Sequence, residues 1–273
     1  IRNISMSSLN HIFKFGTTVL AALVLSACGS SGGGSDTPDS SPVDNKTNLN
    51  QSNSFANNNV IQPQTNNETG AAIVISGEDR DIFVSRAAIN GYNTTSINVD
   101  GTNVAIGYPG ISAGNWTNIS ANGRLLEVCC GRYSDTRFGV SDSLDDNGKA
   151  YLFYNGNPTL NMPTSGSASY YGQSIISANI PALDDEDFYT GSSQFNVDFG
   201  NKSLSGSLDI RNIQPVNING SISGNAFSGY ASSASLSTAP VEGRFYGEQA
   251  KELSGLAKAK DNSWGAAFGA QKQ

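Results

Sequence analysis

The stretch GRFYGEQAKELSGLAKAKDNSWGAAFGA, from Gly243 to Ala270, decides the fold that the chain is expected to adopt. Phe245 and Tyr246 stand between glycines, and a short run of helix-forming residues follows them. Trp264 and Phe268 then fall on one face of a strand whose other positions are mostly glycine and alanine. Small residues beside large aromatic ones let strands bend while the rings fill the interior. The stretch therefore predicts the closing hairpin of a narrow, strongly curved β-barrel.

Eight runs of alternating or β-branched residues predict the strands of that barrel. A small closed barrel needs about eight strands if side chains are to fill its interior. Asn201-Lys202 supplies a tight turn between two of the runs. The predicted strands are Ala150–Asn155, Ser167–Ile180, Ser192–Gly200, Ser203–Ile210, Val216–Ile222, Ala226–Ser232, Val241–Gly247 and Ser263–Gln271.

An outer-membrane pore is the alternative architecture for such a set of strands. Pores of that kind turn an apolar girdle toward lipid and often end on an aromatic residue. This sequence ends Gln271-Lys272-Gln273 instead. We therefore expect a soluble barrel that its own side chains fill.

Shorter β-type runs upstream of the barrel predict a small twisted sheet, with Gly, Asn and Asp turns between its strands. Near residue 145 the short, irregularly spaced runs give way to the more regular pattern of the barrel strands. The expected fold is thus mostly β, with a small N-terminal β-sheet subdomain at 71–145 and an eight-stranded antiparallel barrel at 146–273. The predicted strands of the N-terminal subdomain are Ala72–Ser76, Ile82–Arg86, Ser96–Asp100, Val104–Tyr108, Leu125–Cys130 and Thr136–Asp142.

The first 27 residues are typical of a lipoprotein signal peptide. Arg2 and Lys14 form a positive region, Val19–Leu25 is apolar, and Leu25-Ser26-Ala27-Cys28 is a lipobox, which predicts lipidation of Cys28. Residues 28–70 are rich in Ser, Asn, Gly, Gln and Thr and cannot bury a core, so we expect a disordered tether. A flexible coil of that length spans about 35 Å, which lifts a folded domain off the membrane.

Charge and histidine content exclude several classes of function. The chain has 16 basic and 23 acidic residues, so phosphates repel it and nucleic acid is not an expected partner. Its surface is instead expected to attract a basic patch on a protein partner. The single histidine, His11, leaves with the signal peptide, so neither a Ser-His-Asp triad nor a histidine zinc site is available. We expect no enzymatic activity, no cofactor and no metal.

Two acidic clusters are candidates for a calcium site or an acid/base pair, namely Asp184–Asp187 and the group Asp142, Asp145 and Asp146. Neither has the every-other-residue spacing of a calcium-binding loop. Like charges in a row repel one another and stay exposed. We interpret both clusters as solvated loops.

Cys129 and Cys130 are the only thiols besides Cys28, and an exported protein is in an oxidising compartment. Adjacent cysteines can form a vicinal disulfide. One trans peptide holds their Cα atoms about 3.8 Å apart, however, which is below the usual disulfide range, and neighbours on a strand point to opposite faces. A disulfide and two separately buried thiols both remain open, with redox catalysis a weaker third possibility.

The order of three motifs resembles the C-terminal β-barrel of the transferrin-binding protein B family, shared with factor H-binding protein and the haemophilins. These motifs are Gly-x-Phe-Tyr-Gly at 243–247, Ala-x-Glu-Leu-x-Gly at 250–255 and Trp-Gly-x-x-Phe-Gly-Ala at 264–270. The resemblance implies a barrel preceded by a handle. It also implies a lipid anchor on the outer-membrane surface and export with the surface lipoprotein assembly modulator.

The function implied by the resemblance is capture of a host iron or haem carrier, haemoglobin or transferrin, for delivery to a TonB-dependent transporter. One barrel and one handle stand where transferrin-binding protein B has two lobes, which weakens the case for transferrin. Binding of a complement regulator and direct haem scavenging are the alternatives. After loss of the signal peptide no histidine can ligate haem iron, which favours a protein ligand.

Four aromatic residues of the handle are the candidate binding residues: Tyr92, Tyr108, Trp116 and Tyr133. Trp and Tyr dominate the energetics of protein interfaces. Aromatic residues early in the barrel, such as Tyr151 and Tyr170, are explained by filling of the core. We therefore expect the handle, together with loops at one end of the barrel, to bind the partner.

Overall fold

A computed structural model describes residues 67–76, 83–110, 114–145, 148–183 and 186–273, all within one compact unit. The signal peptide expected at 1–27, Cys28 and residues 28–66 of the expected tether lie outside the described residues. So do Asp146, Asp184 and Asp185 of the acidic clusters. Within the described part, no helix has the length and apolar character needed to cross a membrane.

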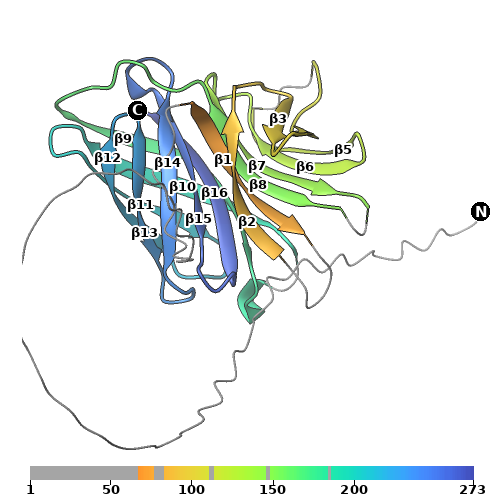
Figure 1. Ribbon diagram of the computed structural model, residues 1–273. Helices are drawn as coiled ribbons and strands as arrows, with labels where there is room; N and C mark the ends of the chain where they lie inside the picture. Colours follow the sequence, from red (N-terminus) through yellow and green to blue (C-terminus); the bar gives the residue numbers. More distant parts are fainter. Residues whose placement is uncertain (1–66, 77–82, 111–113, 146–147, 184–185) are drawn as a thin grey trace, which may run out of the picture. The chain divides into compact units, whose positions relative to one another are not determined.

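The first half of the described chain forms an eight-stranded antiparallel sheet in the order β4-β3-β2-β1-β8-β7-β6-β5 (Figure 1). Its first strand begins at Glu68, so the predicted tether is a few residues too long. The strand was predicted from Ala72 onward, and the polar residues at its start hid only its first few positions. The strands are β1 (Glu68–Ser76), β2 (Phe83–Asn90), β3 (Ser96–Val99), β4 (Thr102–Ala105), β5 (Thr117–Ala121), β6 (Arg124–Cys129), β7 (Thr136–Ser143) and β8 (Ala150–Gly156).

The second half forms a closed antiparallel barrel of eight strands, as the sequence predicted. Closure occurs where the last strand pairs with the first, from Trp264 opposite Ala178 to Lys272 opposite Tyr170. Two short 3-10 helices, η1 (Pro181–Leu183) and η2 (Glu248–Ala250), lie in connections between strands. The strands are β9 (Ser167–Ala178), β10 (Tyr189–Asp198), β11 (Ser203–Ile210), β12 (Val216–Ser223), β13 (Ala226–Ser232), β14 (Ala239–Tyr246), β15 (Glu252–Lys258) and β16 (Trp264–Lys272).

One strand assignment made from the sequence is wrong, and two strands, β5 and β15, were not predicted. Ala150–Asn155, expected as the first barrel strand, is β8 and pairs with β1 and β7 in the sheet. The change from sheet to barrel therefore falls between Gly156 and Ser167. Conversely, β15 was not expected as a strand, because nearly all its residues are buried and the alternation that marks a half-exposed strand is missing.

The sheet has a buried core on each face, and β1 contributes to both. Ala71, Ile73 and Ile75 belong to a cluster that also contains the barrel residues Leu256 and Ala267. Ala72 and Val74, which point the other way along an alternating strand, belong to a second cluster made of sheet residues alone. The sheet is therefore packed against the barrel and also on itself.

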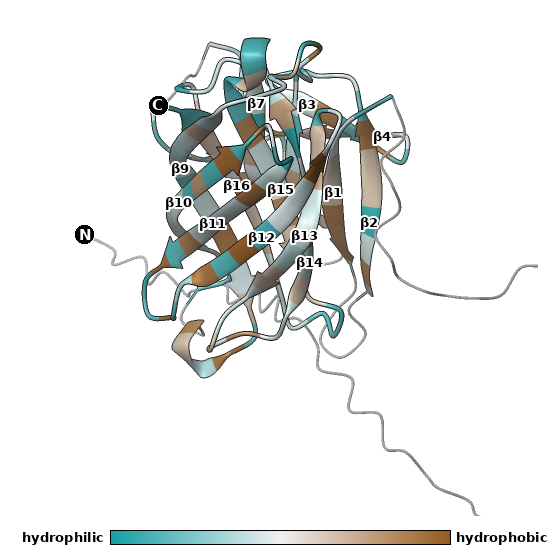
Figure 2. Ribbon diagram, turned by 90° about the vertical axis from the view of Figure 1, so that its left-hand side faces the viewer, coloured by the Kyte–Doolittle hydropathy of each residue, from teal (hydrophilic) through white to brown (hydrophobic). Residues whose placement is uncertain are grey.

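Large aromatic side chains fill the barrel, as the closing hairpin predicted. Trp264, Phe245 and Phe268 are fully buried. The Phe227 ring centroid lies 5.6 Å from that of Phe245 and 6.4 Å from that of Phe268. Figure 2 looks onto the barrel wall and shows hydrophilic and hydrophobic residues intermixed along β9 to β13, as expected of strands with one buried face.

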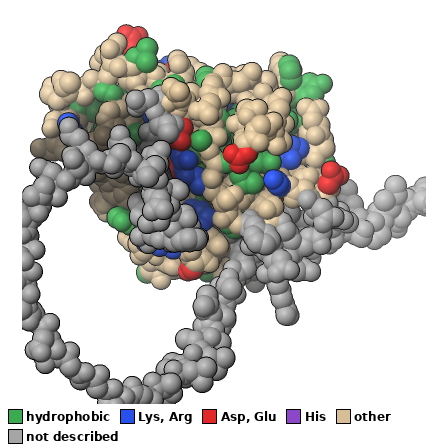
Figure 3. Space-filling view, viewed as in Figure 1, with side chains coloured by type: hydrophobic (Ala, Val, Ile, Leu, Met, Phe, Trp, Pro, Cys, Tyr) green, Lys and Arg blue, Asp and Glu red, His purple; other side chains and the backbone are tan. Residues whose placement is uncertain are grey.

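The surface is sparse in charge, because only 14% of all residues are charged. On the face seen in Figure 3, charged side chains stand in small groups among uncharged side chains and backbone. Local groupings of charge therefore determine which partners a given face attracts.

Candidate binding site

Three loops of the sheet lie at one end of it. They are residues 91–95 between β2 and β3, 106–110 and 114–116 between β4 and β5, and 130–135 between β6 and β7. Successive strands run antiparallel, so alternate connections fall at the same end. We call this the loop end.

A pocket of about 410 Å³ opens among the described parts of these loops. It combines threonine hydroxyls, glycine backbone, a few apolar side chains and one guanidinium group. A concave site with few polar groups is a common form of binding site. The lining residues are Thr94, Thr95, Ile106, Gly107, Tyr108, Pro109, Gly110, Thr117, Val128, Cys130, Gly131 and Arg137.

The loop end brings together the four aromatic residues that were singled out from the sequence, at different depths. Tyr108 is 49% exposed and lines the pocket. Tyr92 and Trp116 are half-buried, and the Trp116 ring packs edge-on against Phe138 at 5.7 Å. Tyr133, expected to be exposed, is completely buried. Its ring packs 5.5 Å from Phe138, so Tyr133 supports the loop end from below and cannot contact a partner directly.

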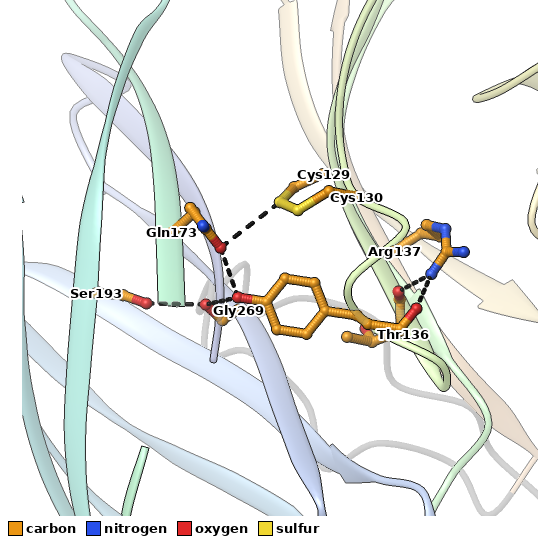
Figure 4. Close-up of a disulfide and its surroundings, with 8 residues drawn as sticks. Cys129, Cys130, Thr136, Arg137, Gln173, Ser193 and Gly269 are labelled. Carbon is orange, nitrogen blue, oxygen red and sulfur yellow. Dashed lines mark hydrogen bonds between the residues drawn. A yellow bond between two sulfur atoms is a disulfide. The ribbon is translucent and has the colours of Figure 1, made fainter. Parts of the chain in front are cut away.

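A disulfide joins Cys129 and Cys130 under the pocket (Figure 4). The Cys129 sulfur lies 3.7 Å from Gln173 Oε1, and the Tyr133 hydroxyl donates a hydrogen bond of 2.6 Å to the same oxygen. Burial raises the pKa of Tyr133 well above its ordinary value, so the phenol stays neutral and remains a donor. Gln173 belongs to β9, and this contact therefore attaches the loop end to the barrel.

Arg137 is the one charged residue among those lining the pocket. Its Nη1 donates to the backbone oxygens of Tyr133 and Thr136, the latter at 2.7 Å. Figure 4 shows the guanidinium extending from β7 past these two carbonyl oxygens. These contacts fix the group in place and keep a positive charge at the pocket.

A barrel loop continues the surface. Asn157 donates its backbone N–H to Asp135 O at 2.8 Å, which joins the connection between β8 and β9 to the loop at 130–135. Thr159 donates from its backbone nitrogen to Phe245 O and from its hydroxyl to Gly247 O. Next to it stands Leu160, which is 92% exposed. Because hydrogen bonds hold the backbone at Thr159, the exposed Leu160 side chain next to it can act as a rigid anchor for a partner.

Leu160, Arg137 and the pocket itself were missed in the sequence. Leu160 is a lone leucine in the polar stretch Asn157–Gly166, close to Pro158, and that contrast was the available signal. Nothing in the sequence around Arg137 indicated a binding site, because its position at the pocket results from how the strands of the sheet pair.

Asp142 of the first acidic cluster lies buried on β7, so the interpretation as a solvated loop is wrong for this residue. Among the described residues, no group of three or more His, Cys, Asp or Glu could hold a metal; Asp146, Asp184 and Asp185 lie outside them.

The local charge at the loop end is the reverse of the charge of the whole chain. Arg132, Lys202, Lys251 and Lys272 lie exposed in the loops and strand ends on this side of the barrel and sheet. The described loops and strand ends on this side carry fewer acidic residues that reach the surface, namely Asp135, Asp198 and Glu248. The expectation of an acidic surface steering a basic partner therefore does not hold here, because this end attracts acidic groups.

Comparison with known proteins identifies relatives of the barrel and of the whole chain. Residues 162–272 match the family described as the C-lobe and N-lobe beta barrels of Tf-binding protein B. A protein of Haemophilus influenzae, described only as uncharacterized, is 42% identical over 287 residues. That alignment covers 96% of this chain and 99% of the relative.

Solved structures share the fold. A transferrin-binding protein B variant of Haemophilus parasuis is 25% identical with a TM-score of 0.56, and the match covers 75% of this chain and 45% of that one. Transferrin-binding protein B of Neisseria meningitidis also has a TM-score of 0.56, at 22% identity, over 75% and 44% of the two chains. The present chain thus spans about half the length of these proteins.

Proposed function

Since the chain belongs to the transferrin-binding protein B-like family, we propose that it binds a host protein that carries iron or haem, with haemoglobin or transferrin as the carrier. The observation that carries this proposal is the loop end, where Tyr108 lines the pocket and the loop that carries the exposed Leu160 is hydrogen-bonded to the loop at 130–135. Tyrosine is among the residues that dominate interface energetics, and backbone that is already held in place loses less entropy on binding.

The proposal includes a place in the cell. Cys28 carries the lipid, the protein stands on the outer-membrane surface after export with the assembly modulator, and a TonB-dependent transporter receives the cargo. Cys28→Ala should release the protein from the membrane fraction, because the hydrophobic anchor is lost. A Cys28→Ala protein that stays in the membrane with unchanged gel mobility would refute the anchor.

Carrier binding is tested by immobilising the chain and titrating purified transferrin, haemoglobin and factor H by surface plasmon resonance. We expect one iron or haem carrier to bind. Tyr108→Ala should weaken that binding about tenfold, as loss of an interface anchor does. Leu144→Ala is the matched control, since Leu144 is 48% exposed against 49% for Tyr108 and lies after β7, at the opposite end of the sheet.

Each other outcome counts against the proposal. Binding of factor H alone favours the complement alternative. Stoichiometric haem uptake, seen as a Soret shift without carrier binding, favours direct scavenging. Carrier binding that Tyr108→Ala leaves unchanged and Leu144→Ala weakens places the interface at the other end of the sheet.

A further inference from the structure

The outer wall of the barrel carries polar side chains that carrier binding at the loop end does not use. β15 and β16 contact the sheet, whereas β10 to β13 form the wall that faces the viewer in Figure 2. The strand register arranges the outward side chains of this wall in transverse rows. One row is Ser169, Asn196, Ser205, Asn219 and Tyr230, and the next is Tyr171, Gln194, Ser207, Asn217 and Ser232.

The wall is hollowed where these rows cross its middle strands. Two hollows of about 280 and 400 Å³ share Asn196 and Ser205. The larger one has short serine side chains on β11 between longer amide side chains on β10 and β12. We call it the amide trough; its polar side chains are Gln194, Asn196, Ser205, Ser207, Asn217 and Asn219.

A tyrosine flanks the amide trough on each side. Tyr171, on β9, is opposite Gln194 and is 54% exposed; Tyr230, on β13, is opposite Asn219 and is 61% exposed. Four strand spacings of the closed barrel separate β9 from β13, so the two residues are roughly 19 Å apart measured round the curved wall. An extended ligand that lies in the trough and follows this curve can meet one tyrosine at each end.

The two rows contain no Asp, Glu, Lys or Arg. The charged residues nearest to the rows are Asp198, which lines the smaller hollow, and Asp209, two positions after Ser207 on β11. A charged ligand would find no counter-charge among these side chains. Amide and hydroxyl groups both donate and accept hydrogen bonds, which suits a ligand dense in neutral hydroxyl groups.

We propose that the amide trough binds a neutral oligosaccharide, a function beyond carrier binding and on a different face of the barrel. The Tyr171 and Tyr230 rings contact the apolar C–H faces of sugar rings, and the amides hydrogen-bond sugar hydroxyls. Part of the site is already ordered: Gln194 Nε2 donates to Ser207 Oγ at 3.1 Å and Ser169 Oγ donates to Asn196 Oδ1 at 3.0 Å. Placement on paired strands limits the entropy lost on binding.

The test applies the labelled full chain to a printed array of neutral, sialylated and sulfated oligosaccharides. The neutral oligosaccharide with the strongest signal is then titrated by calorimetry. We expect binding to neutral glycans. The double variant Tyr171→Ala/Tyr230→Ala, and separately Asn219→Asp, should weaken it at least about tenfold, since stacking of a ring on an aromatic platform and a matched hydrogen bond are lost.

Asp209→Asn is the matched control, because Asp209 is exposed on β11 beyond the trough. All variants are checked for an unchanged Tm, so that loss of binding is not loss of folding. Absence of binding to every neutral glycan, binding to sialylated or sulfated glycans alone, or variants that bind like the wild type would each overturn the proposal. Carrier binding is measured separately, so failure of one proposal does not affect the other.

Discussion

Glu252 is fully buried where the barrel meets the loop at 130–135. Its carboxylate accepts the backbone N–H of Ser134 at 2.9 Å and that of Asp135 at 3.0 Å. Burial raises the pKa of Glu252, and these two donors offset only part of the effect. Glu252 thus holds the loop at 130–135 in place, although removing its carboxylate from water is itself unfavourable.

The raised pKa of Glu252 fixes the sign of a pH dependence. Below the ordinary value of 4.5 the carboxyl is protonated in both folded and unfolded chains, and its burial penalty is absent. As pH rises above that value the unfolded chain loses the proton first, so this group favours unfolding. We therefore expect wild type to lose stability relative to Glu252→Gln as pH rises above 4.5, measured as Tm.

Glu248→Gln is the matched control, since it removes the same charge from an exposed position nearby. A wild-type protein that gains stability over Glu252→Gln as pH rises would show that the backbone donors outweigh burial.

The disulfide between Cys129 and Cys130 gives a second prediction at the residue scale. Alkylation of the folded and then of the denatured protein without reductant should add no mass at these cysteines, because neither has a free thiol. Alkylation after reduction should add two labels. Two labels without reductant would establish the free-thiol alternative.

At this scale the sequence did not indicate how deep the candidate residues lie. Tyr108, Trp116 and the cysteine pair were singled out and do meet at the loop end. The burial of Tyr133 could not be predicted, because it depends on Phe138 and Gln173, which come from other strands. Residues on other strands decide whether a side chain is buried, and the local sequence pattern does not show which residues those are.

β16 shows at the scale of one element how barrel and sheet are fitted together. A Cβ added to Gly269 would lie 2.2 Å from the Phe138 ring of β7, whereas one added to Gly265 would lie no closer than 3.4 Å to any neighbour. Both glycines are buried on the same strand. Gly269 is therefore required by close approach of the sheet.

Gly269→Ala should destabilise the protein by about 1–3 kcal/mol, because the packed core has to move to admit the methyl group. Gly265→Ala is the control and should change the free energy of unfolding far less. Denaturant unfolding of both variants measures the difference. Equal stability of the two variants would mean that the sheet yields at Phe138 and does not pack tightly on β16.

Most barrel strands could be predicted because one face is buried and the other is solvated. Phe195 and Val197 alternate with Asn196 and Asp198, and β10 was found accordingly. β15 was missed, since the sheet covers its outer face and removes the alternation. β8 was assigned to the wrong body because a strand's sequence does not state which neighbours it pairs with.

At the scale of the whole molecule, charge is unevenly distributed. The chain is acidic, yet the loop end presents Arg132, Lys202, Lys251 and Lys272. Charged groups at the rim of an interface act mainly on the association rate. Arg132→Glu/Lys251→Glu should therefore slow carrier association severalfold, with the difference shrinking as salt rises.

Lys260→Glu is the control for this charge reversal, because Lys260 is exposed between β15 and β16, away from the loop end. Stopped-flow association at low and high salt separates the variants. Faster association of the double variant would mean that the partner presents basic groups.

The central claim is that the loop end binds a host iron or haem carrier, and hydrogen exchange in the presence of transferrin or haemoglobin tests it most directly. We predict slowed exchange in residues 91–95, 106–110, 130–135 and 157–166, with the connections at the opposite end of the strands unchanged. Protection confined to that opposite end, or none with either carrier at saturating concentration, would contradict the account.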